Sequence, residues 1–164
     1  MAVADHLGIM KQGRIVQVGT PLDVYNSPND RYVARQLGSP PMNFLEGRIV
    51  PADGGFVADD MAFRVQVSST RLPEGAAWLG VRPEDIAISV EPYGSAAIPA
   101  SIYEIEPLGA VTIVDVKIGD RILKVQAPGQ PRYAPGEGVF LTFDPAKCHI
   151  FDAVTDRRLT AFRA

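Results

Sequence analysis

The spacing of apolar and polar positions divides the chain near residue 40. Before that point, the apolar runs HLGIM (6–10) and GRIVQVG (13–19) flank the sequence Lys11-Gln12-Gly13, which predicts a β-hairpin with a tight turn. Neither run alternates cleanly between apolar and polar residues, as expected for strands that are covered on both faces.

Two short helices are expected after this hairpin. In TPLD (20–23) the threonine can cap free amides, the proline fits the first helical position, and the aspartate can reach back. SPND (27–30) repeats the pattern and predicts a second helix start at Ser27, with Gly38 as a left-handed stop. Two strands and two helices cannot bury enough apolar surface alone. Residues 1–38 are therefore interpreted as the C-terminal remnant of a larger α/β domain.

The remainder of the chain predicts a separate, mostly β domain. Ser39-Pro40-Pro41 begins a stiff linker over residues 39–42, and residues 43–164 follow it as the second domain. Short strand signals recur in this domain at MAFRVQV (61–67), IAISVE (86–91), VTIVDVKIGDRILKVQA (111–127), VFLTFD (139–144) and CHIF (148–151). The third of these is a hairpin candidate with Gly119-Asp120 at its tip. Many short antiparallel strands favour a small barrel or sandwich.

Composition and charge narrow the classes of function. The formal net charge is −3, and an acidic chain without Lys/Arg clusters disfavours nucleic acid as a partner. No apolar run approaches the roughly 18 residues that a membrane-spanning helix needs. MAVADHLGIM lacks the features of a signal peptide. The single cysteine fits a reducing compartment.

The sequence offers little reactive chemistry. It contains no Gly-Lys pair and therefore no phosphate-binding loop, and it contains no Gly-x-Ser-x-Gly elbow. Cys148 and His149 are adjacent, so on a strand they point to opposite faces. They are interpreted as a core thiol and a surface imidazole rather than as metal ligands. Trp78 and Tyr103 are interpreted as core or cross-strand aromatics rather than as a stacking platform. No catalytic, cofactor-binding or metal-binding residue is expected.

Four stretches together resemble the C-terminal part of the ATP-binding subunits of carbohydrate-type ABC importers, with the maltose and glycerol-phosphate importers closest in pattern. They are DHLGIMKQGRIVQVGTPLDVYNSPNDRYVARQLGSPPMNFLEG (5–47), GVRPEDI (80–86), EPLGAVTIVDVKIGD (106–120) and GEGVFLTFDPAKCHIFD (136–152). The resemblance implies that residues from about 40 onward form the OB-like antiparallel β-barrel often called TOBE, a regulatory module that helps to hold a dimer.

The resemblance also implies a setting for the parent protein. That protein would be a homodimeric ATPase that uses ATP and Mg²⁺, contacts membrane-spanning permease subunits, meets a cytosolic regulator, and lies in the cytoplasm at the inner face of the cell membrane. Its phosphate loop, signature motif and switch histidine would precede residue 1, so the chain itself is expected to have no ATPase activity and no cofactor.

The corner RPED (82–85) combines one cation with two carboxylates. Pro83 ends the strand and starts a helical turn, whose N-terminus favours Glu84 and Asp85. Arg82 can bond to either carboxylate or to the carbonyls of a neighbouring strand. One interpretation is that these contacts only orient the corner. The other is that the corner faces a second subunit or a regulator, which makes Arg82, Glu84, Asp85 and also Tyr103 candidate interface residues.

Two other functions remain as alternatives. A small-ligand sensor for a sugar or an oxyanion could use Arg82, Arg121 and Lys124 as its cations. A nucleic-acid-binding OB fold would need a basic groove with aromatic platforms, which the charge balance argues against.

Overall fold

The computed structural model describes residues 4–50, 55–58, 64–66, 72–94 and 96–159. In chain order the elements are β1 (Leu7–Lys11), β2 (Arg14–Gly19), α1 (Pro21–Asn26), α2 (Arg31–Gln36), β3 (Asn43–Val50), β4 (Gly55–Ala58), β5 (Arg64–Gln66), β6 (Gly75–Val81), the 3-10 turn η2 (Pro83–Asp85), β7 (Ile86–Ser89), β8 (Ile98–Pro107), β9 (Val111–Ile118), β10 (Arg121–Pro128), β11 (Gly138–Phe143), the 3-10 turn η3 (Pro145–Lys147) and β12 (His149–Asp152).

Residues 5–37, called here the α/β segment, form the hairpin and two helices that the sequence predicts. β1 pairs antiparallel with β2, and the turn residues Gln12 and Gly13 have φ angles of 50° and 76°. The side chain of Thr20 accepts a hydrogen bond from the Asp23 amide at 3.2 Å, which caps α1 as expected. Gly38 has a φ of 108° and follows the end of α2.

The predicted start of the second helix at Ser27 is wrong. Ser27 instead belongs to the end of α1, where its amide donates to the Asp23 carbonyl at 2.8 Å. Asp30 is the N-cap of α2, and its side chain accepts from the Val33 amide at 2.8 Å. The SPND pattern offers two possible caps, and the first is already used to close the preceding helix.

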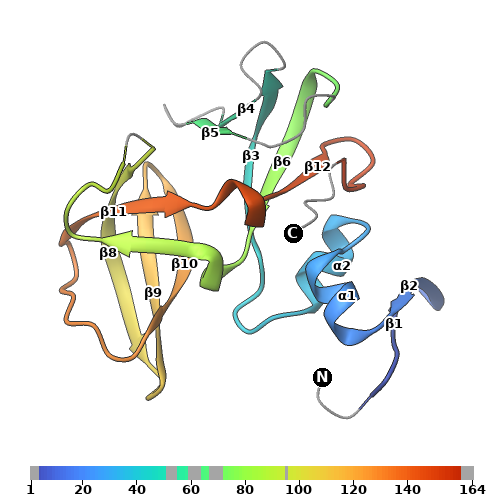
Figure 1. Cartoon of the computed structure of the whole chain (residues 1–164), viewed down its shortest axis with the longest axis horizontal. Coiled ribbons are helices and arrows are strands. Elements are labelled where there is room, and N and C mark those ends of the chain that lie inside the picture. The colour runs from blue at the N-terminus through green and yellow to red at the C-terminus, as the bar shows by residue number, and fades with distance from the viewer. Residues whose placement is uncertain (1–3, 51–54, 59–63, 67–71, 95, 160–164) are drawn as a thin grey trace.

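Residues 43–159, called here the β module, form two five-stranded antiparallel sheets (Figure 1). One sheet has the order β10-β9-β8-β11-β7 and the other has the order β12-β6-β3-β4-β5. The chain crosses between the sheets through η2 and again through η3. Gly119 and Asp120 connect β9 and β10 as predicted. The mostly β, OB-like fold class is confirmed; η3 has no counterpart in the sequence-based prediction.

The two sheets share one hydrophobic core. Alternating side chains of β9 and β10, such as Val114, Val116 and Val125, meet residues of β3 and β6 in this core, including Leu45 and Leu79. The α/β segment lies beside the β module (Figure 1) and has a small cluster of its own, which contains the buried residues Ile9, Val24 and Val33. The segment is therefore outside the core of the β module.

The first predicted strand of the β module is only partly described. β5 covers Arg64–Gln66, and Val65 is buried as the alternating pattern predicts. Met61, Phe63 and Val67, the other residues expected on that face, lie outside the described residues.

Candidate functional site at the joint between the two parts of the chain

Arg82 joins the β module to the α/β segment. It follows the last residue of β6, and Pro83 turns the chain away from the sheet at that point. Only 2% of Arg82 is exposed. One guanidinium nitrogen, Nη1, donates to the Leu37 carbonyl at 2.9 Å, and Nη2 donates to the Tyr25 carbonyl at 2.5 Å. A single cation thus satisfies carbonyls at the C-terminal ends of both helices, where positive charge is favoured.

The partners of Arg82 differ from those that the sequence suggested. The sequence suggested its neighbouring carboxylates or the carbonyls of a strand, whereas the carbonyls that it reaches belong to helix ends 45 and 57 residues away. Helix ends are natural partners because their last carbonyls have no partner within the helix. Burial lowers the pKa of Arg82, and Glu84 and Asp85 act in the opposite direction. Arg82 stays charged, since an arginine pKa lies far above neutrality.

The Tyr25 ring completes this contact. The guanidinium carbon of Arg82 lies 3.4 Å from the ring centroid, which is a cation–π geometry. The Tyr25 hydroxyl donates a hydrogen bond to Glu84 Oε1. Burial raises the pKa of Tyr25 to about 12, and the hydrogen bond to Glu84 adds to the rise. Arg82 and Glu84 therefore both bind Tyr25 of α1.

Gly38 leaves the space that this contact needs. A Cβ atom at residue 38 would lie 3.1 Å from Arg82 Nη1 and 3.0 Å from the Pro40 carbonyl oxygen. The φ of 108° is also strained for any residue with a side chain. Gly38 thus ends the second helix and admits the guanidinium beside it.

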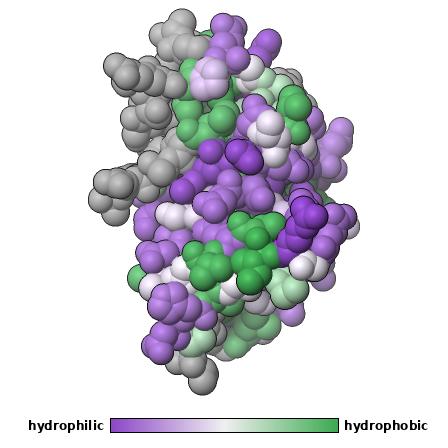
Figure 2. Space-filling view, turned by 90° about the vertical axis from the view of Figure 1, so that its right-hand side faces the viewer, coloured by the Kyte–Doolittle hydropathy of each residue, from purple (hydrophilic) through white to green (hydrophobic). Residues whose placement is uncertain are grey.

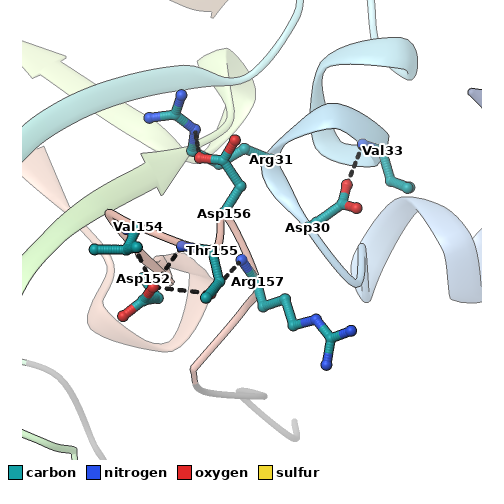
Figure 3. A network of polar contacts seen from close by, with 8 residues as sticks. All are labelled: Asp30, Arg31, Val33, Asp152, Val154, Thr155, Asp156 and Arg157. Atoms are coloured by element: carbon teal, nitrogen blue, oxygen red, sulfur yellow. Dashed lines mark hydrogen bonds and ion pairs between the residues drawn. The ribbon is translucent and has the colours of Figure 1, made fainter.

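A second group of contacts holds the start of α2 (Figure 3). Arg31 Nε lies 2.9 Å from Asp156 Oδ1, and the Arg31 guanidinium carbon lies 4.0 Å from the Trp78 ring centroid. The backbone of the C-terminal turn contributes as well, since the Arg31 amide donates to the Asp156 carbonyl and the Arg158 amide to the Asn29 carbonyl. The turn after β12 thereby binds the N-terminal end of α2.

Apolar packing also joins the α/β segment to the β module. Ala34 of α2, Met42 and Phe151 of β12 form one buried cluster, with Phe44 packed against it. A Cβ atom at Gly80 would lie 2.7 Å from the Met42 sulfur and 2.8 Å from the Phe151 ring. The glycine of GVRPEDI is therefore required by close packing at the joint.

Packing at the joint explains why the sequence predicted the surroundings of Cys148 correctly and those of His149 wrongly. Cys148 is fully buried, as expected for a core thiol, and burial raises its pKa to about 12. His149 was predicted at the surface, but only 7% of it is exposed. The face of β12 that carries His149 also carries Phe151, which packs against the α/β segment. Burial, with Arg158 next in size, lowers the pKa of His149 to about 4, so the imidazole is neutral at pH 7.

The structure brings three of the four candidate interface residues together. Arg82 and Glu84 contact α1 directly, and Asp85 follows them in η2, where burial and then Glu84 raise its pKa. Tyr103 lies on β8 with 56% of its surface exposed, and it takes no part in the joint. An interface role for these four residues stays a prediction. Sequence reasoning missed Tyr25, whose helix shows no local sign of its distant partner.

Each of the cations suggested for an anion sensor contacts another group of the chain. Arg82 is engaged by helix carbonyls. Lys124 Nζ lies 2.7 and 2.9 Å from the two carboxylate oxygens of Asp115, and Arg121 lies 4.0 Å from Glu46. None of the three is placed to serve an anion in preference to its partner within the chain.

Exposed apolar side chains gather on the α/β segment. Figure 2 looks at the side of the molecule where this segment lies and shows a hydrophobic group surrounded by hydrophilic side chains. Met10, Ile15, Val18 and Leu22 are 59%, 64%, 61% and 69% exposed, respectively. Patches of this kind usually mark contact surfaces.

Within the described ranges, no helix is long and apolar enough to cross a membrane.

Two family models match parts of the chain. The family model of the MalK OB fold domain matches residues 38–86, and that of the TOBE domain matches residues 79–151. The two matches overlap on LGVRPEDI, which contains the Arg82 corner. Residues 38–151 are thus similar to the MalK OB fold domain and to the TOBE domain. The resemblance stated from the sequence is confirmed.

Curated relatives extend this match over nearly the whole chain. The multiple sugar-binding transport ATP-binding protein MsmK of Streptococcus mutans is 34% identical over 95% of this chain and 46% of its own length. The sulfoquinovosyl glycerol transport ATP-binding protein SmoE of Agrobacterium fabrum is 35% identical over 97% and 45%. The sn-glycerol-3-phosphate import ATP-binding protein UgpC of Salmonella typhi is 33% identical over 97% and 44%. The chain therefore spans slightly less than half the length of these relatives.

A solved structure supports the fold alone. The cytoplasmic molybdate-binding protein ModG, in a crystal form with molybdate bound, matches with a TM-score of 0.55 at 8% sequence identity. The match covers 66% of this chain and 94% of that one.

Proposed function

We propose that this chain is the regulatory and dimer-supporting part of an ATP-binding subunit that powers import of sugars or related solutes. The observation that carries the proposal is the joint itself. Arg82, in the overlap of the two family matches, bonds to both helices of a segment that the importer subunits share. A movement of those helices would be passed to the β module through these bonds. A regulator bound to the β module would in turn favour one position of the helices.

The proposal also covers the cofactors, partners and location of the whole protein. The whole protein would use ATP and Mg²⁺, form a homodimer, contact membrane-spanning permease subunits and lie at the cytoplasmic face of the membrane. The exposed patch on β1, β2 and α1 would be covered by the ATP-binding part of the longer protein. This chain would supply no group to hydrolysis.

A chimera tests the proposal. The corresponding residues of MsmK from Streptococcus mutans are replaced by this chain, and sugar uptake, ATPase activity and dimerisation are measured. We expect the chimera to dimerise and to support uptake, and we expect Arg82→Met to reduce uptake more than it reduces ATP binding. A folded chimera whose uptake and ATPase activity are the same with Arg82→Met as without it would exclude the joint as a coupling element.

The isolated chain provides two further tests. Sedimentation over a range of concentrations should show self-association, and a strict monomer at the highest concentration would remove the dimer-supporting role. Incubation with Mg²⁺ and ATP should release phosphate no faster than ATP hydrolysis in buffer without the protein. Measurable turnover would show that the chain has a catalytic centre, contrary to the proposal.

A small-ligand sensor is the alternative function. Nothing in the placement of Arg82, Arg121 and Lys124 favours it, since each is engaged elsewhere. A thermal shift that grows with the concentration of a sugar, sugar phosphate or oxyanion would revive it.

A further inference from the structure

A groove of about 580 Å³ lies in the β module at the η2 corner, and none of its lining residues belongs to the α/β segment. Residues from β7, β10, η2 and η3 line it, together with Asp144, which precedes η3, and Pro131 and Tyr133 of the loop after β10. A volume in this range suits a ligand of several hundred daltons. All of its lining residues belong to the β module, and one of them, Glu84, also takes part in the joint.

Two strand edges meet at this groove. In the five-stranded sheet of the described structure, β10 and β7 are the outermost strands, so each has one edge without a strand partner. Lys124 shows which way the edge of β10 faces, because its amide and carbonyl bond to the side chain of Asn43 rather than to β9. Two residues further along, the amide and carbonyl of Gln126 face the same side. Pro128 then ends this edge without an amide hydrogen.

The side chains around the groove give it a chemical preference. Apolar groups of Ile86, Ile88 and Ala127 line the strands, and Tyr133 adds a ring. The charged groups are three carboxylates, Glu84, Asp85 and Asp144, and one ammonium group, Lys147. The net charge around the groove is therefore negative, which favours a cationic ligand and disfavours an oxyanion.

We propose that this groove binds an extended segment of another protein, which lies along the β10 edge as an added strand and places a lysine or arginine side chain against Asp85 and Asp144. The free edge supplies main-chain hydrogen bonds at Gln126, the apolar lining accepts alternate side chains, and the carboxylates select a basic residue. A small cation would satisfy the carboxylates and leave the strand edge unused, so a peptide uses more of what the groove offers.

This docking site goes beyond the proposed function and does not depend on it. It has one consequence for the joint, because Glu84 lines the groove and also accepts the hydrogen bond of Tyr25. A basic residue that draws Glu84 toward the groove weakens its bond to α1. Occupancy of the groove is thus linked to the contact between the two parts of the chain.

A random eight-residue peptide display library, panned on the whole chain, tests the proposal. Panning on the Ile88→Arg variant, which places a cation and extra volume in the groove, removes peptides that bind elsewhere. We expect the selected peptides to carry a lysine or arginine flanked by alternating apolar residues. Selection of no peptides above background, or of peptides without a basic residue, overturns the proposal.

The selected peptide is then measured by fluorescence anisotropy. N-methylation of alternate peptide amides should weaken binding about tenfold, because it removes the main-chain bonds to the edge. Asp85→Asn or Asp144→Asn should each weaken binding about threefold to tenfold. Asp120→Asn, in the turn between β9 and β10, is the matched control and should change nothing. Equal binding of the N-methylated peptide, or an equal loss with Asp120→Asn, contradicts strand addition.

A second copy of the chain is the other occupant that the test must distinguish. If Ile88→Arg converts a self-associating chain into a monomer in sedimentation, the groove is filled by another copy and the peptide proposal is wrong. If self-association is unchanged in this variant, the groove is free for the peptide.

Discussion

Removal of the Arg82 guanidinium is the sharpest perturbation of the joint. Arg82→Met keeps much of the aliphatic stem and removes both hydrogen bonds and the contact with the Tyr25 ring. The carbonyls of Tyr25 and Leu37 then lose their charged donor at a site where Arg82 itself is almost fully buried. The α/β segment has only a small hydrophobic cluster of its own, so we expect it to open while the β module stays folded.

The expected magnitude follows from these contacts. Each hydrogen bond from a charged donor contributes about 1.5–3 kcal/mol, and a partly desolvated cation–π contact contributes about 1–2 kcal/mol. Burial of the guanidinium opposes them, as the lowered pKa of Arg82 shows, and this desolvation costs several kcal/mol. The net loss is about 3 kcal/mol, which is roughly a hundredfold in the population of the open state.

Hydrogen exchange at single amides is the appropriate measurement. The amides of Val24 and Ala34, which bond to the Thr20 and Asp30 carbonyls, report on the two helices. We expect their protection to fall roughly a hundredfold in Arg82→Met, with little change at β-module amides such as Leu123. Protection of these helix amides in Arg82→Lys should be intermediate between the unmodified chain and Arg82→Met, since an ammonium group lacks the planar fork that reaches two carbonyls at once.

A matched control separates a local effect from a general loss of charge. Arg121→Met removes a cation from β10, where the ion pair is long and its side chains are 30% and 54% exposed, and should alter stability by less than about 1 kcal/mol. If Arg82→Met leaves exchange in both helices at the level of the unmodified chain, the guanidinium does not hold the joint. An equal loss across the β module would show that the two parts unfold together.

Four other outcomes follow from the structure. Gly80→Ala should lower the free energy of unfolding by about 1–3 kcal/mol, measured by urea denaturation, because its Cβ would lie within 2.8 Å of a methionine sulfur and a phenylalanine ring. Because the pKa of His149 is lowered to about 4, the folded state binds fewer protons than the unfolded state. The contribution of His149 to the free energy of unfolding is therefore fully present above about pH 6.5 and is lost as the pH falls from there toward about 4. Thermal unfolding measured across this range should show the melting temperature falling with pH, and His149→Gln should remove that fall. Absorbance titration should find one tyrosine near pH 12 that disappears in Tyr25→Phe and titrates earlier in Glu84→Gln. Ile15→Lys, on the exposed patch, should weaken self-association about tenfold in sedimentation, and unchanged association would exclude the hairpin as a contact surface.

The sequence alone determined the local elements and the resemblance to importer subunits. Alternating apolar positions in β9 and β10 fix the inward face of a strand, and the turn at Gly119 needs a residue that tolerates a positive φ. The Thr20 cap could likewise be assigned, because its partner lies three residues away. The second helix start was misplaced because two adjacent caps have the same local pattern, and only the ends of neighbouring elements decide between them.

Only the tertiary structure decided what the RPED corner contacts and which surfaces are covered. The partners of Arg82 lie 45 and 57 residues away, and no local pattern encodes a contact at that separation. His149 illustrates the same limit, since strand alternation gives its face but does not tell whether another part of the chain packs on that face. Side-chain direction depends on neighbouring dihedral angles, whereas burial and pKa depend on the whole fold, because they are set by every group that displaces water.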